Sequence, residues 1–570
     1  MKETSLPPKE AFYSSLSEET CSDEDYDIAL KTFKAFNCKN IEDYTKLYCL
    51  LDTLLLGEVL LAFIEEAQND FGLDVTNYIS LPQLSFDAML KSTGVELDYI
   101  PDEDMILALE QGIRGGVSYV STRHVDVEKD DGIIQYLDFN NLYGYAQMQK
   151  LPARNYKWLK KKEIEALDIT KVSDEGDIGY ILEVDLHYPE SLRKHHDGIP
   201  LAPEHFDIFH DTLSAYSKEC LKVTSGKQNN NKYHTSKLCG TFFDKKKYLV
   251  HYRNLKYYLK KGLIVTKTHR VIQFEQEKFA LPYINFTAKK RAESKSAFKK
   301  RTANSLFGKW LQNVRKYHEV KILKKKSTVA KYLASPRFKS FRILNDNLIA
   351  VFLEKKHVML DRIYSVGFTV LELSKLAMFQ CYYDVIQPRF GFENVDVLLS
   401  DTDSFILHLK NCTREEAREK LADVMDFSNL PTDSKFYNAD RKNVPGYLKD
   451  ETPNSSILEC IALKSKCYLI RAKNDDDNKI AIEKKCKGVT KARVKRLKET
   501  NFRNCVTNMQ VIKGKMARIS ASKHELRTVL QNKVCLSSFD DKRYLLNCGK
   551  HSKTYQAEVR SDNCEKCTID

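Results

Sequence analysis

Val397-Leu-Leu-Ser-Asp-Thr-Asp-Ser-Phe-Ile-Leu-His-Leu409 places two aspartates, Asp401 and Asp403, between two apolar runs. Apolar runs on either side of a short polar turn predict a β-hairpin with carboxylates at its tip. Carboxylates crowded at a strand end repel one another unless a cation lies between them, and magnesium prefers such hard oxygen ligands. Asp-x-Asp pairs are also common in solvated turns, and this stretch alone favours such a turn.

An upstream stretch, Ile133-Ile-Gln-Tyr-Leu-Asp-Phe139, repeats this arrangement. Its apolar residues predict another strand, which delivers Asp138 at its end and is followed by a turn and Tyr143. Carboxylates at the ends of two strands can converge on a shared pair of metal ions. The second element therefore favours ligand roles for Asp401 and Asp403 over a solvated turn.

A third element, Lys300-Arg-Thr-Ala-Asn-Ser-Leu-Phe-Gly308, lies between the two aspartate elements. No proline or glycine interrupts residues 284–307, which predicts a helix. Lys300, Asn304 and Phe307 then share one helix face. The same spacing occurs in any amphipathic helix, so its position in the chain, rather than the spacing, indicates a binding function.

Taken in chain order, the strand of Asp138, the Lys300–Gly308 element and the hairpin of Asp401 and Asp403 resemble motifs A, B and C of family B DNA polymerases, in particular the protein-primed branch of adenoviruses, linear plasmids and self-synthesising transposons. The likeness runs from about Tyr26 to about Leu546. Many relatives outside the transposon-like group have proline at the position of Gly144, so the stretch 138–146 is more similar to the transposon and virus group. The resemblance implies an α+β fold, the right-hand polymerase fold with palm, fingers and thumb. It also implies a DNA-directed DNA polymerase, which is a nucleotidyltransferase.

The resemblance assigns the catalytic centre to the strand-end carboxylates. Asp138 and Asp403 would hold two Mg²⁺ or Mn²⁺ ions, with the Phe139 carbonyl completing the site and Asp401 as an outer or alternate ligand. One ion would lower the pKa of the primer 3′-hydroxyl, and the other would neutralise the triphosphate. Tyr143 would lie beneath the sugar and exclude a 2′-hydroxyl.

The predicted helix would supply the remaining nucleotide contacts. The resemblance implies that Lys300 binds the phosphates, with Asn304 beside it, and that Phe307 stacks on the base. Relatives more often have tyrosine at the position of Phe307, so the hydroxyl is dispensable and stacking is what remains.

One expected DNA contact precedes the first aspartate element. Ile113-Arg-Gly-Gly-Val117 offers the Arg114 side chain to a phosphate, and Gly115 and Gly116 allow close approach of the backbone to the template. Without the resemblance, paired glycines indicate only a turn.

The other expected DNA contacts follow the hairpin. Lys466 and Tyr468 on one strand would have both side chains on one face, where the resemblance implies contact with the primer terminus. A surface pair is the alternative. The densely basic run 484–498 would follow the duplex backbone from the thumb, and a solvated helix face is its alternative.

The amino-terminal part contains an incomplete resemblance to a proofreading exonuclease. Tyr48 and Asp52 fall on one face of a predicted helix, as in the third exonuclease motif, and an ordinary surface pair is the alternative. The apolar run Leu47–Ala67 includes acidic residues and predicts a buried or amphipathic helix rather than a membrane span. Because the other two motifs are missing, we expect a truncated chain that does not proofread, in which this helix packs against the Arg114 segment.

The bulk composition limits the class of protein. With 570 residues, 42% hydrophobic and 11% aromatic, the chain is expected to form several folded subdomains. A net charge of +13 suits a polyanionic partner. Fifteen cysteines without framework spacing, and a polar start without a signal peptide, indicate an intracellular protein.

The resemblance also implies partners and a location. We expect a monomer that binds template and primer DNA, deoxynucleoside triphosphates and a terminal (priming) protein, and no membrane. Its location would be a host-cell nucleus or a virus-associated compartment. The alternative function is an inactive, mobile-element-derived DNA-binding protein, although three intact motifs argue against it. A reverse transcriptase would have two adjacent aspartates in its hairpin motif.

The expected domains follow in chain order, and the tail leaves one question open. In the tail, Cys548-x-x-His551 and Cys564-x-x-Cys567 have the ligand types and spacing of a small zinc knuckle, but the sequence favours an unstructured tail. The domains are a flexible start at 1–25, an exonuclease remnant at 26–110, palm with a terminal-protein-region insertion at 111–282, fingers at 283–315, palm with a second insertion at 316–480, thumb at 481–547 and the tail at 548–570.

Overall fold

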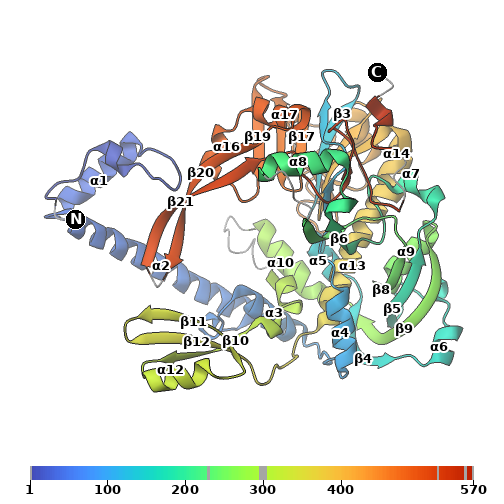
Figure 1. The fold of residues 1–570 in the computed structure, drawn as a ribbon, viewed down its shortest axis with the longest axis horizontal. Helices are drawn as coiled ribbons and strands as arrows, with labels where there is room; N and C mark the ends of the chain where they lie inside the picture. Colours follow the sequence, from blue (N-terminus) through green and yellow to red (C-terminus); the bar gives the residue numbers. More distant parts are fainter. Residues whose placement is uncertain (1–2, 227–231, 294–304, 523–524, 558–560, 568–570) are drawn as a thin grey trace.

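A mixed sheet forms the centre of the protein. The computed structural model describes residues 3–226, 232–293, 305–522, 525–557 and 561–567 (Figure 1). The main path of the sheet runs β1-β13-β14-β3-β17-β18-β19, and β2, β15 and β16 pair beside it. The strands of this path are Ser118–Val120 (β1), Val395–Asp401 (β13), Ser404–Leu409 (β14), Ile133–Phe139 (β3), Ser455–Lys464 (β17), Cys467–Asn474 (β18) and Ile480–Cys486 (β19). The strands beside it are His124–Asp126 (β2), Met425–Asp426 (β15) and Leu448–Asp450 (β16).

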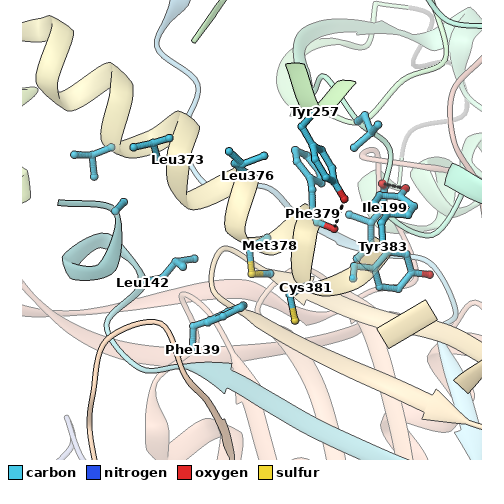
Figure 2. Packing of buried hydrophobic residues seen from close by; sticks show 14 of the residues in the cluster. Phe139, Leu142, Ile199, Tyr257, Leu373, Leu376, Met378, Phe379, Cys381 and Tyr383 are labelled. Carbon is cyan, nitrogen blue, oxygen red and sulfur yellow. Dashed lines mark hydrogen bonds between the residues drawn. The ribbon is translucent and has the colours of Figure 1, made fainter. Parts of the chain in front are cut away.

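Helix α13 (Tyr364–Gln380) forms the core above this sheet. Most of its side chains are buried, because it packs against α5 (Leu142–Gln147) and α9 (Tyr252–Lys260) and shares one apolar core with Leu137, Phe139 and Leu407 of the sheet. A π-helical turn, Cys381–Ile386, continues it towards α14 (Gln387–Phe390). Figure 2 shows the end of α13 between Phe139 of β3 and Tyr257 of α9. The Tyr257 hydroxyl donates to the Phe379 carbonyl oxygen at 3.3 Å. The helix thus fixes β3 and the turn after it.

A second sheet lies in the interval where the sequence predicts the first insertion. Its order is β4-β9-β5-β8, and a separate pair, β6 and β7, lies beside it. Helices α6 (Lys161–Ala166), α7 (Arg193–His196) and α8 (Ala215–Ser225) connect these strands. The strands are Leu151–Trp158 (β4), Ile178–His187 (β5), Glu204–Phe209 (β6), His234–Cys239 (β7), Lys245–His251 (β8) and Ile264–Glu277 (β9).

A third sheet lies in the interval of the second predicted insertion. Its order is β10-β12-β11, with α12 (Lys326–Leu333) packed on it. Before it, α10 (Leu281–Glu293) begins the segment that carries the predicted nucleotide contacts, and residues 305–310 are again helical. The strands are His318–Leu323 (β10), Phe338–Asn345 (β11) and Leu348–Glu354 (β12).

The carboxyl-terminal part follows directly on the central sheet. Because β19 pairs with β18 along its length, residue 481, where the sequence predicts the thumb to begin, lies within a strand of the central sheet. The helices α16 (Lys491–Arg496) and α17 (Glu499–Asn508) and the long hairpin β20 (Ile512–Ser522) and β21 (Glu525–Leu536) follow. A small hairpin, β22 (Tyr544–Leu545) and β23 (Ser552–Lys553), ends the strands. All fifteen cysteines lie in the described residues, and none of them forms a disulfide.

The amino-terminal helices correct two predictions. Helix α2 (Ile41–Phe71) was predicted to be buried or amphipathic, but among its residues only Ala67 is buried, and exposed apolar side chains surround it. It extends away from the sheet towards α1 (Asp23–Ala35) (Figure 1), and it is long and apolar enough to cross a membrane by length and composition. The start of the chain is also more ordered than predicted, because Lys9–Phe12 is a 3₁₀ helix and α1 begins at Asp23.

Candidate active site

Strand pairing brings the three predicted aspartates together at the same end of neighbouring strands in the central sheet. Asp138, near the end of β3, lies opposite Ser404 of β14, and Asp401, at the end of β13, pairs with Ser404 across the hairpin. The backbone N–H of Phe139 donates to the Asp403 carbonyl oxygen at 2.8 Å. The strand that carries Asp138 therefore lies directly beside the hairpin of Asp401 and Asp403, as the sequence predicts.

The hairpin turn is held from the side by the segment before β1. Thr402 has a φ of +66°, which costs free energy for a β-branched residue, and its N–H donates to the Val117 carbonyl at 2.8 Å. A Cβ atom on Gly116 would lie 2.3 Å from Cγ2 of Thr402, so only glycine fits there. The template contact of Gly116 stays a prediction, and the structure gives this glycine a further task, because it leaves room for the turn at Thr402.

The electrostatics of the three aspartates fit a divalent cation. Burial raises the pKa of Asp138 to about 7, with a further contribution from the Asp403 charge. Burial also raises the pKa of Asp403, and the Asp401 charge adds to this effect. Among the described residues, Asp138 and Asp403 form no ion pair with a lysine or arginine, whereas Asp401 lies 2.8 Å from Lys466 Nζ. Two crowded carboxylates that lack a direct ion pair among the described residues are the donor set that Mg²⁺ or Mn²⁺ prefers.

We expect Mg²⁺ binding to depend on pH in a defined direction. The pKa of Asp138 is about 7 in the folded protein, above the unfolded value of 3.8, so the metal-free protein loses stability as pH rises from 4 through 7. Mg²⁺ must displace this proton, so below pH 7 its affinity should fall by roughly tenfold per pH unit. Calorimetric titration with MgCl₂ at pH 6, 7 and 8 measures this slope, and Asp138→Asn should flatten it. A pH-independent affinity for the unmodified protein would contradict the assignment.

Two predicted nucleotide contacts lie together beside the aspartates. Tyr143 of α5 and Phe307 stack with ring centroids 4.3 Å apart and an interplanar angle of 14°. Burial raises the pKa of Tyr143, and the negative charges of Asp403 and Asp401 raise it further. Trp310 donates to Gln147 of α5 at 3.1 Å and thereby holds the helix of Phe307 against α5. Lys300 and Asn304 lie outside the described residues.

A basic pocket of about 710 Å³ adjoins Asp401. Lys466 and Tyr468 line it together, but Lys466 lies in the turn between β17 and β18, with a φ of +60°, so its predicted place on a strand is wrong. The Tyr468 hydroxyl lies 3.3 Å from the Tyr136 hydroxyl. The other basic side chains of the pocket come from the run after β18: Lys484, Lys485, Lys487, Lys491 and Lys495.

Arg114 does not have the position that the sequence predicts. Its side chain is buried, its guanidinium lies 3.8 Å from the centre of the Tyr248 ring, and it donates to the Leu249 carbonyl oxygen. Glu372 of α13 lies 3.8 Å away and balances the charge. The predicted phosphate contact of Arg114 is therefore wrong in this structure, while Gly115 lies exposed beside it.

The exonuclease-like pair lies apart from these residues. Tyr48 is 60% exposed and Asp52 is also exposed, both on α2. The end of α2 packs on α10, where Asp70 pairs with Lys290 at 2.6 Å and Phe71 contacts Tyr283. The predicted packing of this helix against the Arg114 segment is wrong, because Arg114 is enclosed by β8 and α13.

Several supporting residues escaped the sequence-based reasoning. Asn140 donates to Asp426 at 2.7 Å, and the Asn141 side chain accepts the N–H of Gly144 at 3.1 Å. A Cβ on Gly144 would collide with Asn141, which explains the glycine there. Asn-Asn after a strand signals a turn, so Asn141 could have been found, but the Asp426 contact depends on β15 and β16.

Comparison with known families decides the assignment. The family model described as "DNA polymerase type B, organellar and viral" matches residues 11–354, more than half of the chain. The chain belongs to this family. In this type B polymerase chain the matched part includes Asp138, Tyr143 and Phe307, whereas the hairpin of Asp401 and Asp403 lies beyond it.

Individual relatives agree with the family. A protein named "Probable DNA polymerase" from Ascobolus immersus is 30% identical over 145 residues, which are 25% of this chain and 11% of that relative. The type B polymerase chain thus spans about a tenth of the curated relative that it matches. Two solved structures of Phi29 DNA polymerase, one complexed with primer-template DNA and one an orthorhombic crystal form, are each 15% identical with a TM-score of 0.50. Each match covers 82% of this chain and 69% of the Phi29 chain, which supports a shared polymerase fold.

Proposed function

We propose that this chain is a DNA-directed DNA polymerase that extends a DNA 3′ end by metal-dependent phosphoryl transfer. The observation that carries the proposal is the meeting of Asp138 and Asp403, both without an ion-pairing cation among the described residues, beside the stacked rings of Tyr143 and Phe307. Carboxylates with raised pKa values at a ligand site are typical of catalysis rather than of folding stability.

The residues of the site have separate tasks in this proposal. Asp138 and Asp403 would hold two Mg²⁺ ions, with Asp401 and the Phe139 carbonyl as further ligands. When bound, the ions would activate the 3′-hydroxyl and neutralise charge on the triphosphate. Tyr143 and Phe307 would separate to admit the sugar and base, and positioning would supply most of the remaining catalysis. Lys300 and Asn304 remain predicted phosphate contacts.

The same proposal divides the chain into the parts of a right hand. The central sheet with α13 would be the palm, and α10 through residue 310 the fingers. The helices α16 and α17 with the β20–β21 hairpin would form the thumb. The sheets around β5 and β12 would be the two insertions, and the first of these would contact the terminal protein. The helix α2 would be the remnant of an exonuclease domain.

The basic pocket supports a binding site for the primer backbone. Lys466 is 46% exposed and joins Asp401 to the pocket, so its ammonium group can exchange between the carboxylate and a phosphate. A pair this exposed contributes under about 1 kcal/mol to stability, so a ligand role costs the fold little. The row of lysines after β18 would continue this contact along the duplex.

Primer extension tests the proposal directly. We expect the purified protein to extend a recessed DNA 3′ end with deoxynucleotides and Mg²⁺, and EDTA to abolish extension. Protein priming is then tested by incubating the polymerase with labelled deoxynucleotide and a candidate terminal protein, without primer. We expect the label to become attached to a tyrosine or serine of the terminal protein. Extension without protein labelling would refute only the priming claim. DNA binding without extension, with Mg²⁺ or Mn²⁺, would instead support the inactive DNA-binding alternative.

A further inference from the structure

The carboxyl-terminal segment brings together four side chains that no step of the proposed reaction uses. Cys548, His551, Cys564 and Cys567 each present one ligand atom, and these atoms all lie within 4.8 Å of one another. The predicted unstructured tail is therefore wrong for the described residues, because a short hairpin and a 3₁₀ turn assemble this cluster.

The distances in the cluster match a tetrahedral metal site. Nδ1 of His551 lies 3.6, 3.2 and 3.5 Å from the sulfurs of Cys548, Cys564 and Cys567. With Zn–S bonds near 2.3 Å and Zn–N bonds near 2.05 Å, tetrahedral angles place sulfur and nitrogen about 3.6 Å apart. A single imidazole nitrogen offers one hydrogen bond, so hydrogen bonding does not account for three sulfurs around it.

The backbone around the ligands has the geometry of two metal-binding turns. The His551 N–H points to the Cys548 sulfur at 3.4 Å, as in turns that stabilise a bound thiolate. Gly549, with a φ of +68°, makes this turn possible. Cys564 precedes a 3₁₀ turn that ends at Cys567. The Asn547 N–H donates to the Asp562 carbonyl at 2.9 Å and joins the two halves of the cluster.

We propose that Cys548, His551, Cys564 and Cys567 bind one structural Zn²⁺ ion, which fixes the end of the chain against the edge of the central sheet. Three thiolates and one imidazole form a closed ligand set without an open position for substrate. The zinc would therefore be separate from the Mg²⁺ site in chemistry and in place.

The surroundings show what such an ion would hold. Arg123 is fully buried and donates to the carbonyls of Gly549, at 3.2 Å, and Ser538, at 2.8 Å, while its own N–H donates to Lys550 at 2.7 Å. Thr122 forms a β-bridge with His551. Thr122 and Arg123 follow shortly after β1, the edge strand whose Ser118 pairs with Asp401. The proposed zinc site thus lies against the segment after edge strand β1, and β1 pairs with the strand that ends at Asp401.

Metal analysis of the purified full-length chain tests the proposal. We expect about one zinc per chain after dialysis against EDTA at neutral pH, and its loss in Cys548→Ser and in Cys567→Ser. His551→Cys, which keeps four ligands, should retain the ion. Cys38→Ser is the matched control, because Cys38 is partly exposed like Cys548 and Cys567 and lies outside the cluster. Asp403→Asn should also keep its zinc, which separates this site from the Mg²⁺ site.

Cobalt substitution covers the case in which the variants fail to fold. The unmodified chain loaded with Co²⁺ should show the intense visible absorption of tetrahedral thiolate coordination. Absence of both zinc and this spectrum, or zinc that persists in Cys548→Ser, would overturn the proposal. A disulfide among the three cysteines in the freshly purified, unreduced protein would do the same. None of these measurements depends on polymerase activity.

Discussion

Asp138→Asn or Asp403→Asn should abolish magnesium-dependent DNA synthesis while leaving the fold and DNA binding intact. Each substitution removes one of the two carboxylates that meet at the hairpin, so the divalent ions lose a charged ligand. Loss of a preorganised charge of this kind costs at least about 10³-fold in rate. Primer extension under single-turnover conditions measures the effect, and band-shift titration measures DNA binding.

The stability of the same variants distinguishes a functional site from a structural one. In the metal-free protein the two carboxylates repel each other, so Asp138→Asn should leave the thermal midpoint unchanged or raise it above pH 7. Stabilisation by added Mg²⁺ should disappear in both variants. Asp476→Asn, in the exposed turn between β18 and β19, is the matched control and should behave like the unmodified protein. Extension by either active-site variant at more than about a thousandth of the unmodified rate would refute the assignment.

Gly116→Ala should lower the rate of synthesis by about 100-fold, because misplacing a catalytic group by about 1 Å has an effect of this size. The new methyl group would overlap Thr402, whose N–H is held by Val117, and the turn would have to move with Asp401 and Asp403. Affinity for DNA should change little. Measurement of kcat and of primer-template affinity separates the two effects.

The neighbouring glycine provides the control for this prediction. Gly115→Ala adds the same methyl group where no atom lies within 4 Å, so the turn should keep its position. Thr402→Gly in the Gly116→Ala background should restore at least tenfold of the lost rate, because it removes the clash and suits the positive φ. Equal activity of Gly116→Ala and Gly115→Ala would show that the contact with Thr402 is unimportant for catalysis.

Local pattern was a reliable guide where one strand or helix carries the information. The hairpin of Asp401 and Asp403 follows from its two apolar runs, and the strand of Asp138 follows in the same way. The pattern failed for α2, whose apolar composition suggested burial although its side chains are exposed. An apolar composition indicates that a helix is stabilised by packing against another apolar surface, but it does not predict which segment provides that surface.

The positions of charged side chains depended on contacts between distant segments. The sequence assigned Arg114 to a phosphate because arginine suits that role, whereas Tyr248 and Glu372, each more than 100 positions away, enclose it. Lys466 likewise lies in a turn beside Asp401 rather than on a strand. A hydrophobic periodicity extends over only a few residues, so it cannot predict these contacts between distant segments.

By itself, the sequence determined the order of the three motif-like elements, the residues at the strand ends and the family that they resemble. Only the tertiary structure decided that Gly116 supports the turn of Thr402, that Tyr143 stacks on Phe307, and that the last cysteines surround His551. The physical reason is the range of the interactions. Hydrophobic alternation acts between near neighbours in the chain, whereas steric fit and ligand geometry join segments that meet only after the sheet has formed.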